Sequence, residues 1–292
     1  MADFTIVTAS DSAHLPMFYG LLESLRSFPE GRGVAVNLFD MGLEPDDKAK
    51  LAGAVAGIVD PGWDLEFTGQ DQRPGWFKAY ICRPFIPRHF PGYDAYLWLD
   101  SDMWVQDWAA VHTFLRGAER GRLAAVPTYD RNFCKLPSEQ LAERLSLTGS
   151  WWEAAFGPEL ARRHYMRPSI NGGAFALAAG APHWREWRDC MTVVIQKYSQ
   201  FMIDQITMNW LIYERGLPLS ALPMTCNWMC NVLMPQYDTA RQLFVAPGEP
   251  YERIGIMHLS GIAKRPGLRE IDTTDGGPVQ VSLRYDPRRR PG

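Results

Sequence analysis

Several features that would mark other classes of protein are missing from this chain. No apolar run approaches the roughly 20 residues that a membrane-spanning helix needs. The strand-like segment at residues 4–8 is too short for a secretion signal and has no basic residues before it. The five cysteines include no Cys-x-x-Cys pair, which favours reduced, buried thiols over disulfides or a zinc site. The sequence therefore predicts a cytoplasmic protein.

Strong charge of one sign is also missing. The chain has 30 basic and 33 acidic residues, with no basic stripe of the kind that binds nucleic acid. The arginines at 288–290 could touch acidic lipid head groups, but a solvated terminus is the favoured interpretation. We therefore predict no nucleic-acid partner and at most peripheral contact with a membrane.

Two common nucleotide-binding motifs are absent as well. No Gly-x-Gly-x-x-Gly follows the first strand-like segment, and the chain has no P-loop. These absences argue against a Rossmann dehydrogenase and against a P-loop kinase. Any nucleotide bound by this chain must be held by other means.

What is present is an alternation of strands and helices. Strands are predicted at residues 4–8, 34–39, 64–67 and 95–99, with helices at 15–25 and from Pro45 onward. This order predicts an α/β fold, with a mainly parallel, twisted sheet flanked by helices on both faces. Ligands of such sheets bind at the carboxyl ends of the strands.

The second half is less regular. A strand is predicted at 123–127, and a polar and aromatic insertion at 128–168 is predicted to hold two short helices, at 138–145 and 151–165. An apolar run with paired glycines follows at 169–177, then a helix at 182–198 and another that includes Asp204.

The most informative motif is Asp100-Ser101-Asp102, directly after the apolar strand at 95–99. Residues i and i+2 of an extended chain face the same side, so both carboxylates can converge on one point. Like charges placed together repel, and a bound divalent cation relieves that repulsion. Taken alone, Asp-x-Asp is more often a solvated turn, but the preceding strand favours a metal site that also holds nucleotide phosphates.

A second cluster lies near the C-terminus, where His258, Gly261 and Lys264 follow one another at intervals of three. Imidazole is a borderline ligand, so a set of two carboxylates and a histidine suits Mn²⁺ better than Mg²⁺. Gly261 permits a tight turn, and Lys264 can neutralise phosphate oxygens as a point charge. Together with the aspartates, His258 is therefore a candidate third metal ligand.

Six segments, in order, resemble the retaining glycosyltransferases of the GT-A fold, family eight, which include bacterial lipopolysaccharide galactosyl- and glucosyltransferases and glycogenin. The matching segments cover residues 4–265 and are residues 6–11, Arg83, residues 99–102, residues 170–174, Asp204-Gln205 with Asn209, and residues 258–261 with Lys264. Ala13 and His14 depart from the family, because many bacterial relatives carry Asn and Tyr at these two positions. The resemblance implies a GT-A-type nucleotide-diphospho-sugar transferase fold.

The resemblance also implies roles for individual residues. Those similar to the family's metal ligands are Asp100, Asp102 and His258, with Mn²⁺ as the expected ion and Mg²⁺ as the alternative. Those similar to its donor-binding residues are Thr8, Ala9 and Asp11 at the uracil, Arg83, Asn171, Gly172 and Asp204 at the sugar, and Gly261 and Lys264 at the diphosphate. Ser101, between the two aspartates, is a further donor-binding candidate. Asp204 and Gln205 are the catalytic candidates, and Gln205 matches the residue beneath the anomeric carbon.

The function that follows is a metal-dependent retaining glycosyltransferase, moving a hexose from a UDP-sugar to a hydroxyl of a glycan or glycolipid acceptor. A neutral amide is a poor nucleophile, so we favour front-face attack by the acceptor, with the leaving phosphate taking its proton. The alternatives are a sugar nucleotidyltransferase and a non-catalytic protein that binds nucleotide sugars on a transferase fold.

For its organisation we predict a single domain at residues 1–265. Residues 1–127 form the nucleotide-binding half and residues 128–265 the donor-sugar and acceptor half. Residues 266–292 are a C-terminal tail.

Overall fold

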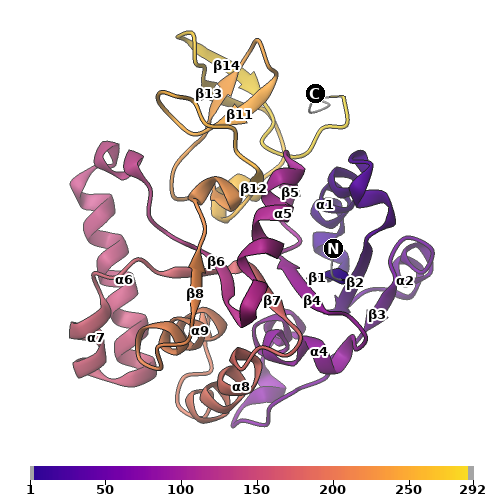
Figure 1. Ribbon diagram of the computed structural model, residues 1–292, viewed down its shortest axis with the longest axis vertical. Helices are drawn as coiled ribbons and strands as arrows, with labels where there is room; N and C mark the ends of the chain where they lie inside the picture. The colour runs from indigo at the N-terminus through magenta and orange to yellow at the C-terminus, as the bar shows by residue number, and fades with distance from the viewer. Residues whose placement is uncertain (1–2, 289–292) are drawn as a thin grey trace.

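A seven-stranded sheet forms the centre of the molecule (Figure 1). The computed structural model describes residues 3–288, except for the side chain of Ile262. Across the sheet the strands lie in the order β3 (Gly57–Val59), β2 (Ala35–Asp40), β1 (Phe4–Ser10), β4 (Ala95–Leu99), β7 (Ile170–Ala178), β6 (Leu123–Pro127) and β8 (Leu219–Ala221).

β7 is the strand that reverses direction. β1 pairs in parallel with β2 and β4, β2 with β3, and β6 with β8, whereas β7 lies antiparallel between β4 and β6. The predicted α/β architecture with a mainly parallel sheet is therefore confirmed. Because β7 is reversed, its N-terminal end reaches the sheet edge where β1 and β4 have their carboxyl ends, with Ala174 paired to Leu99.

Alternating side chains build a hydrophobic core on each face of this sheet. Ile6 and Leu97 belong to one core, and their neighbours Val7 and Trp98 belong to the other. On the first face lie α1 (Leu15–Ser27) and α5 (Trp108–Gly117), and α2 (Pro45–Leu51) contributes Leu51. On the second face lie α3 (Lys78–Ile81), α4 (Ile86–His89), α8 (His183–Val194) and α9 (Ile203–Tyr213).

A second, three-stranded sheet continues from the end of β4. Its central strand is β12 (Ile256–His258), which pairs antiparallel with β5 (Met103–Val105) and in parallel with β9 (Trp228–Met229). β5 follows β4 after a turn of three residues, 100–102, so the two sheets meet at the Asp-x-Asp motif.

The C-terminal part adds two small antiparallel pairs. They are β10 (Gln236–Asp238) with β11 (Leu243–Val245), and β13 (Arg269–Asp272) with β14 (Pro278–Val281), at the top of Figure 1. After β14, Leu283 is buried, and its carbonyl accepts a hydrogen bond from Trp104 Nε1 at 2.8 Å. The segment after residue 265 thus packs against the rest of the molecule at least as far as Tyr285, whose ring centroid lies 5.8 Å from that of Trp104. Of the arginines at 288–290, Arg288 is exposed and the other two lie outside the described residues.

Several predicted elements differ from the structure in detail, among them the helix predicted at 182–198, which ends at Val194. Residues 64–67 are not a strand, and the edge strand β3 lies earlier, at Gly57–Val59. Phe67 is buried, but the Asp64 carboxylate pairs with Arg88 and His89, which anchors this segment beside α4 instead of at the sheet.

In place of the two short helices predicted at 138–145 and 151–165, the structure has one long helix followed by one short helix. α6 (Ser138–Phe156) runs unbroken through residues 146–150, and α7 (Pro158–His164) follows at once. The break falls at Gly157, whose φ of 91° ends α6, and Pro158 then begins α7.

Among the described residues, no helix combines the length and the apolar character needed to cross a bilayer. α6, at 19 residues, is long enough, but its sequence carries several charged side chains.

We expect buried His183 to destabilise the protein in acid. Its Nε2 lies 3.1 Å from the carbonyl oxygen of Pro218, and burial lowers its pKa from 6.5 to about 4. Because the pKa is lower in the folded state, the unfolded chain takes up the proton first. Stability is therefore fully present above pH 6.5 and falls as the pH drops toward 4, by about 1 to 2 kcal/mol at pH 5. Urea unfolding at pH 7 and pH 5 measures this.

The matched variants are His183→Gln and His112→Gln, the second at a partly exposed histidine. His183→Gln should lose part of the pH dependence, and His112→Gln should keep it. An equal pH dependence in wild type and His183→Gln would contradict the assignment.

Candidate functional site

Backbone hydrogen bonds hold the Asp-x-Asp turn between the two sheets. The Asp100 N–H donates to the Gly173 carbonyl of β7 at 2.8 Å, and the Asp100 carbonyl accepts from Met103 N–H at 3.0 Å. The Asp102 carbonyl accepts from Leu259 N–H at 2.9 Å, directly after β12. Both aspartates are therefore fixed by strands that are distant in the sequence.

Three possible metal ligands converge here. β12 pairs with β5 so that His258 lies opposite Met103, next to Asp102. His258 Nε2 is 3.5 Å from Asp102 Oδ1, and one ligand atom from each of Asp100, Asp102 and His258 lies within 4.8 Å of the other two. Such a group could hold a divalent cation.

Lys264 supplies positive charge at the same point. Its Nζ lies 2.8 Å from Asp102 Oδ2, and its side chain is 42% exposed, against 7% for Asp102. Burial alone would raise the pKa of Asp102, but the charge that His258 carries when protonated and the charge of Lys264 bring that pKa below its ordinary value. Gly261, with a φ of 61°, begins the 3₁₀ turn that carries Lys264.

Arg83 forms ion pairs with two acidic side chains, Asp100 and Asp204. Its guanidinium is buried, with Nη2 2.8 Å from Asp100 Oδ1, Nη1 3.0 Å from the Gly172 carbonyl and Nη1 also paired with Asp204. It lies over the Trp98 ring, with Cζ 4.7 Å from the centroid. Burial alone would lower the pKa of Arg83, but Asp100 and Asp204 raise it, so the arginine stays charged.

Asp204 has one carboxylate oxygen that is buried without a hydrogen-bond partner among the described residues. Burial raises the pKa of its carboxyl, and the charge of Arg83 only partly offsets this. Oδ2 pairs with Arg83, but Oδ1 is buried and has no hydrogen-bond partner among the described residues. Since buried polar atoms are rarely left unpaired, Oδ1 is a position where a bound hydroxyl would be accommodated.

The Gln205 amide is committed to hydrogen bonds within the protein. Its Oε1 accepts from Gly172 N–H at 3.0 Å and from Asn171 Nδ2 at 3.2 Å, and its Nε2 donates to Ser169 Oγ at 2.9 Å. Gln205 therefore fixes the start of β7 as well as lying beside Asp204.

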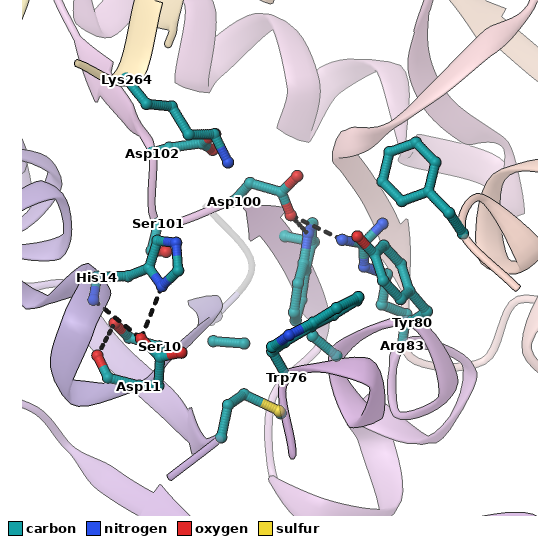
Figure 2. A pocket seen from close by; sticks show the side chains of 15 residues that line it. Ser10, Asp11, His14, Trp76, Tyr80, Arg83, Asp100, Ser101, Asp102 and Lys264 are labelled. Carbon is teal, nitrogen blue, oxygen red and sulfur yellow. Dashed lines mark hydrogen bonds and ion pairs between the residues drawn. The ribbon is translucent and has the colours of Figure 1, made fainter. Parts of the chain in front are cut away.

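A cavity of about 320 Å³ lies in front of these groups. Figure 2 shows Asp11 and His14 on one side of it and Arg83 and Tyr80 on the other, with Asp100 between them. Asp11 Oδ1 accepts from the His14 backbone N–H at 2.9 Å and lies 2.7 Å from His14 Nδ1. The pocket thus has Asp11 at one end and Arg83 at the other, and Asp100 and Asp102 of the candidate metal-binding group lie along its lining.

Not every candidate from the sequence lines this pocket. Those that do are Ala9, Asp11, Arg83, Asp100, Ser101, Asp102 and Lys264. Thr8 does not, because its side chain is fully buried in β1. Gly172 and Asp204 contact Arg83, and His258 contacts Asp102, so these three lie directly behind the lining. Asn171 and Gln205 lie one contact further back, and exposed Gly261 does not line the pocket but begins the turn that carries Lys264. Asn209 serves the scaffold, binding the Ile170 backbone through both its Oδ1 and its Nδ2.

The sequence reasoning missed an aromatic wall formed by Trp76, Tyr80 and Phe201, all of which line the pocket. Tyr80 makes edge contacts with both others, at centroid distances of 6.0 and 5.8 Å. Trp76 is 45% and Phe201 56% exposed, which is unusual for large apolar side chains. In the sequence, the i, i+4, i+7 spacing of Trp76, Tyr80 and Arg83 could have indicated that these side chains share one face of a helix.

It also missed Asn227, which lies just before β9. This side chain is completely buried and contacts both His258 and Asn171. A lone asparagine in the segment Cys226-Asn227-Trp228 carries no local signal of its position, because the contacts join residues 31 and 56 positions apart.

The residues present fit a divalent cation. A Cβ added at Gly173 would lie 2.7 Å from His258 Cε1 and 2.9 Å from both Asp100 Oδ2 and Asn171 Oδ1. The absence of a side chain at this position is therefore what lets the three ligands approach one another. Two carboxylates and an imidazole form a donor set suited to Mn²⁺.

Comparison with known proteins identifies the fold. No protein-family model and no curated protein sequence matches this chain. Among solved structures, the bifunctional glycosyltransferase WbbM in its apo form matches with a TM-score of 0.53 and 13% identity, over 89% of this chain and 46% of that one.

Two further structures match over similar lengths. The galactosyltransferase LgtC, in complex with donor and acceptor sugar analogues, has a TM-score of 0.51 and 13% identity, over 89% of this chain and 88% of LgtC. GlyE of Streptococcus pneumoniae TIGR4 has a TM-score of 0.53 and 16% identity, over 90% of this chain and 56% of GlyE. The chain therefore has the GT-A fold of glycosyltransferases, as predicted.

Gly173→Ala tests the ligand geometry directly. The added methyl must displace His258, Asp100 or Asn171, so we expect Mn²⁺ affinity, measured by titration calorimetry, to fall at least about tenfold. Gly180→Ala is the matched control, because a Cβ there meets nothing within 4 Å. Unchanged Mn²⁺ binding in Gly173→Ala would show that Asp100, Asp102 and His258 do not form the metal site.

Proposed function

We propose that this protein is a metal-dependent retaining glycosyltransferase that moves a hexose from a UDP-sugar to a hydroxyl of a glycan or glycolipid. The observation that carries the proposal is the cluster of Asp100, Asp102 and His258 beside Lys264, at the edge of a pocket in a GT-A fold. In this proposal residues 1–127 hold the nucleotide and residues 128–265 supply the sugar and acceptor contacts.

The donor would lie along the pocket with its base at the end formed by Asp11, His14 and the backbone at Ala9. Asp11 Oδ1 already accepts from His14, and its second carboxylate oxygen is left to accept a base N–H. The ring of His14 can stack on the base. The donor sugar would then lie toward Arg83 and Asp204 at the opposite end.

The diphosphate would lie between these ends. Asp100, Asp102 and His258 would hold a divalent cation, Mn²⁺ being favoured, and that cation would supply positive charge to the leaving phosphate. Lys264 Nζ, on a partly exposed side chain at the pocket edge, would add a second positive charge there. Charge placed in advance where negative charge develops is the largest contribution available to such a site.

The sugar end supports stabilisation of the cationic half of the transition state, not a covalent intermediate. Gln205 is a neutral amide already engaged by Ser169, Asn171 and Gly172, so it is poorly suited to attack the anomeric carbon. Asp204 Oδ1, which is buried without a partner among the described residues, would accept a sugar hydroxyl, and the carboxylate would stabilise positive charge on the ring. These contacts favour front-face attack by the acceptor, with the leaving phosphate taking the proton.

Release of UDP from a panel of UDP-sugars tests the reaction class. We expect turnover of one donor with Mn²⁺, less with Mg²⁺ and none with EDTA, because the negative charge of the leaving group would be uncompensated without a cation. UDP binding without turnover of any donor, in the presence of varied sugar acceptors, would instead support the non-catalytic alternative.

Asp102→Asn should lower turnover about a thousandfold or more, since it weakens a metal ligand and breaks the ion pair with Lys264. Asp71→Asn, at an exposed aspartate away from the pocket, is the matched control and should be fully active. Steady-state UDP release measures both variants. Full activity of Asp102→Asn would rule out the assigned site.

Gln205→Ala should lower kcat about a hundredfold while UDP affinity stays close to wild type, because Gln205 lies at the sugar end of the pocket. Gln72→Ala, at an exposed glutamine, is the control. Comparing kcat with the UDP dissociation constant separates the two effects. A changed UDP affinity with an unchanged kcat would contradict the placement of Gln205.

A further inference from the structure

Asn227 lies behind the metal cluster, in a hydrogen-bonded chain that runs from β7 to His258. The Gly173 N–H donates to Asn171 Oδ1 at 2.9 Å. Asn227 Nδ2 donates to that same oxygen at 2.8 Å, and Asn227 Oδ1 lies 2.9 Å from His258 Nδ1. Asn227 and His258 are both buried, so water does not replace these bonds.

The direction of every hydrogen bond in this series follows from the first one, between Gly173 and Asn171. A backbone N–H can only donate, so the Asn171 atom that faces Gly173 must be the oxygen. Because that oxygen can only accept, the Asn227 atom facing it must be the NH₂ group. The remaining Asn227 atom is then an oxygen, and His258 Nδ1 must carry the proton that it accepts.

The unprotonated nitrogen of neutral His258 is consequently Nε2. This is the atom that faces Asp102 Oδ1, at 3.5 Å. A nitrogen lone pair facing carboxylates is an arrangement that a cation stabilises, and it is the form of imidazole that binds metals. Metal-bound histidines generally donate their second ring N–H to an oxygen acceptor, which fixes both tautomer and ring orientation.

We propose that Asn227 is a positioning residue that holds His258 in the tautomer and orientation required to bind the metal. This inference rests on the proposed metal-dependent transfer and adds to it a residue that touches neither donor nor pocket. The same series of hydrogen bonds also links the proposed metal site to the sugar end of the pocket, because Asn171 Nδ2 contacts Gln205 Oε1 at 3.2 Å.

The first test uses the metal-free wild-type protein. Long-range ¹H–¹⁵N spectra of ¹⁵N-histidine-labelled protein distinguish a protonated ring nitrogen from a bare one, and His258→Gln assigns the signal among the six histidines. We expect a protonated Nδ1 and a bare Nε2 at His258. A proton on Nε2 with a bare Nδ1 would overturn the inference, whatever the variants do.

The second test compares Asn227 variants by Mn²⁺ titration calorimetry and by the same spectra. Asn227→Ala removes the acceptor, so we expect Mn²⁺ affinity to fall about 10- to 100-fold and the Nδ1 proton to lose its fixed position. Asn227→Asp keeps an oxygen facing Nδ1 and should retain the protonated Nδ1 and tighter Mn²⁺ binding than Asn227→Ala. Asn132→Ala, at a buried asparagine outside the site, controls for general destabilisation and should bind Mn²⁺ like wild type.

The outcomes separate this inference from the proposed function. Wild-type Mn²⁺ affinity in Asn227→Ala overturns the inference and leaves the proposed transferase standing. Absence of Mn²⁺ binding in the wild-type protein overturns both. Weakened binding in Asn227→Ala, improved in Asn227→Asp and normal in Asn132→Ala, supports the role assigned to Asn227.

Discussion

The site depends on charge compensation between buried acids and two cations. Asp102 and Asp204 are almost fully removed from solvent and Asp100 is partly so, an arrangement that is costly unless positive charge lies close by. Arg83 compensates Asp100 and Asp204 together, while Lys264 compensates Asp102. Arg83 is itself fixed by the Gly172 carbonyl and the Trp98 ring, so its charge stays where the acids need it. The pocket is therefore electrostatically organised before any ligand binds.

That organisation follows from one reversed strand. With β7 parallel to its neighbours, its glycine-rich start would lie at the far edge of the sheet, away from Asp100. Running antiparallel, β7 brings Asn171, Gly172 and Gly173 against the Asp-x-Asp turn and against α9. At Gly172 and at Gly173, the missing side chain lets neighbouring polar groups lie close to the backbone. A side chain at Gly172 would meet Asp204 and Arg83, and one at Gly173 would meet Asp100 and His258.

Much of this could be predicted from local sequence. The apolar run at 95–99 ending in two acids, and the acidic and basic groups spaced along the chain, point to a strand-edge site in an α/β fold. Prediction failed where distant contacts decided the outcome. Residues 64–67 alternate like a strand, but the ion pairs of Asp64 hold them beside α4. Trp76 and Phe201 are large apolar side chains of the kind usually found in a core, yet they line the pocket. The packing of the whole molecule decides which apolar side chains stay exposed, so the local sequence does not show it.

By itself, the sequence determined the type of each element and the kinds of chemical group at the strand ends, because hydrophobic periodicity and residue chemistry are local properties. It also predicted that the carboxylates of Asp100 and Asp102 would converge at the end of the strand at 95–99. Only the tertiary structure decided which groups meet. The pairing of β12 with β5 placed His258 beside Asp102, and β9 carried Asn227 behind it. Hydrogen-bond direction, ligand spacing and burial are relations between segments far apart in the chain, so they exist only once the chain has folded.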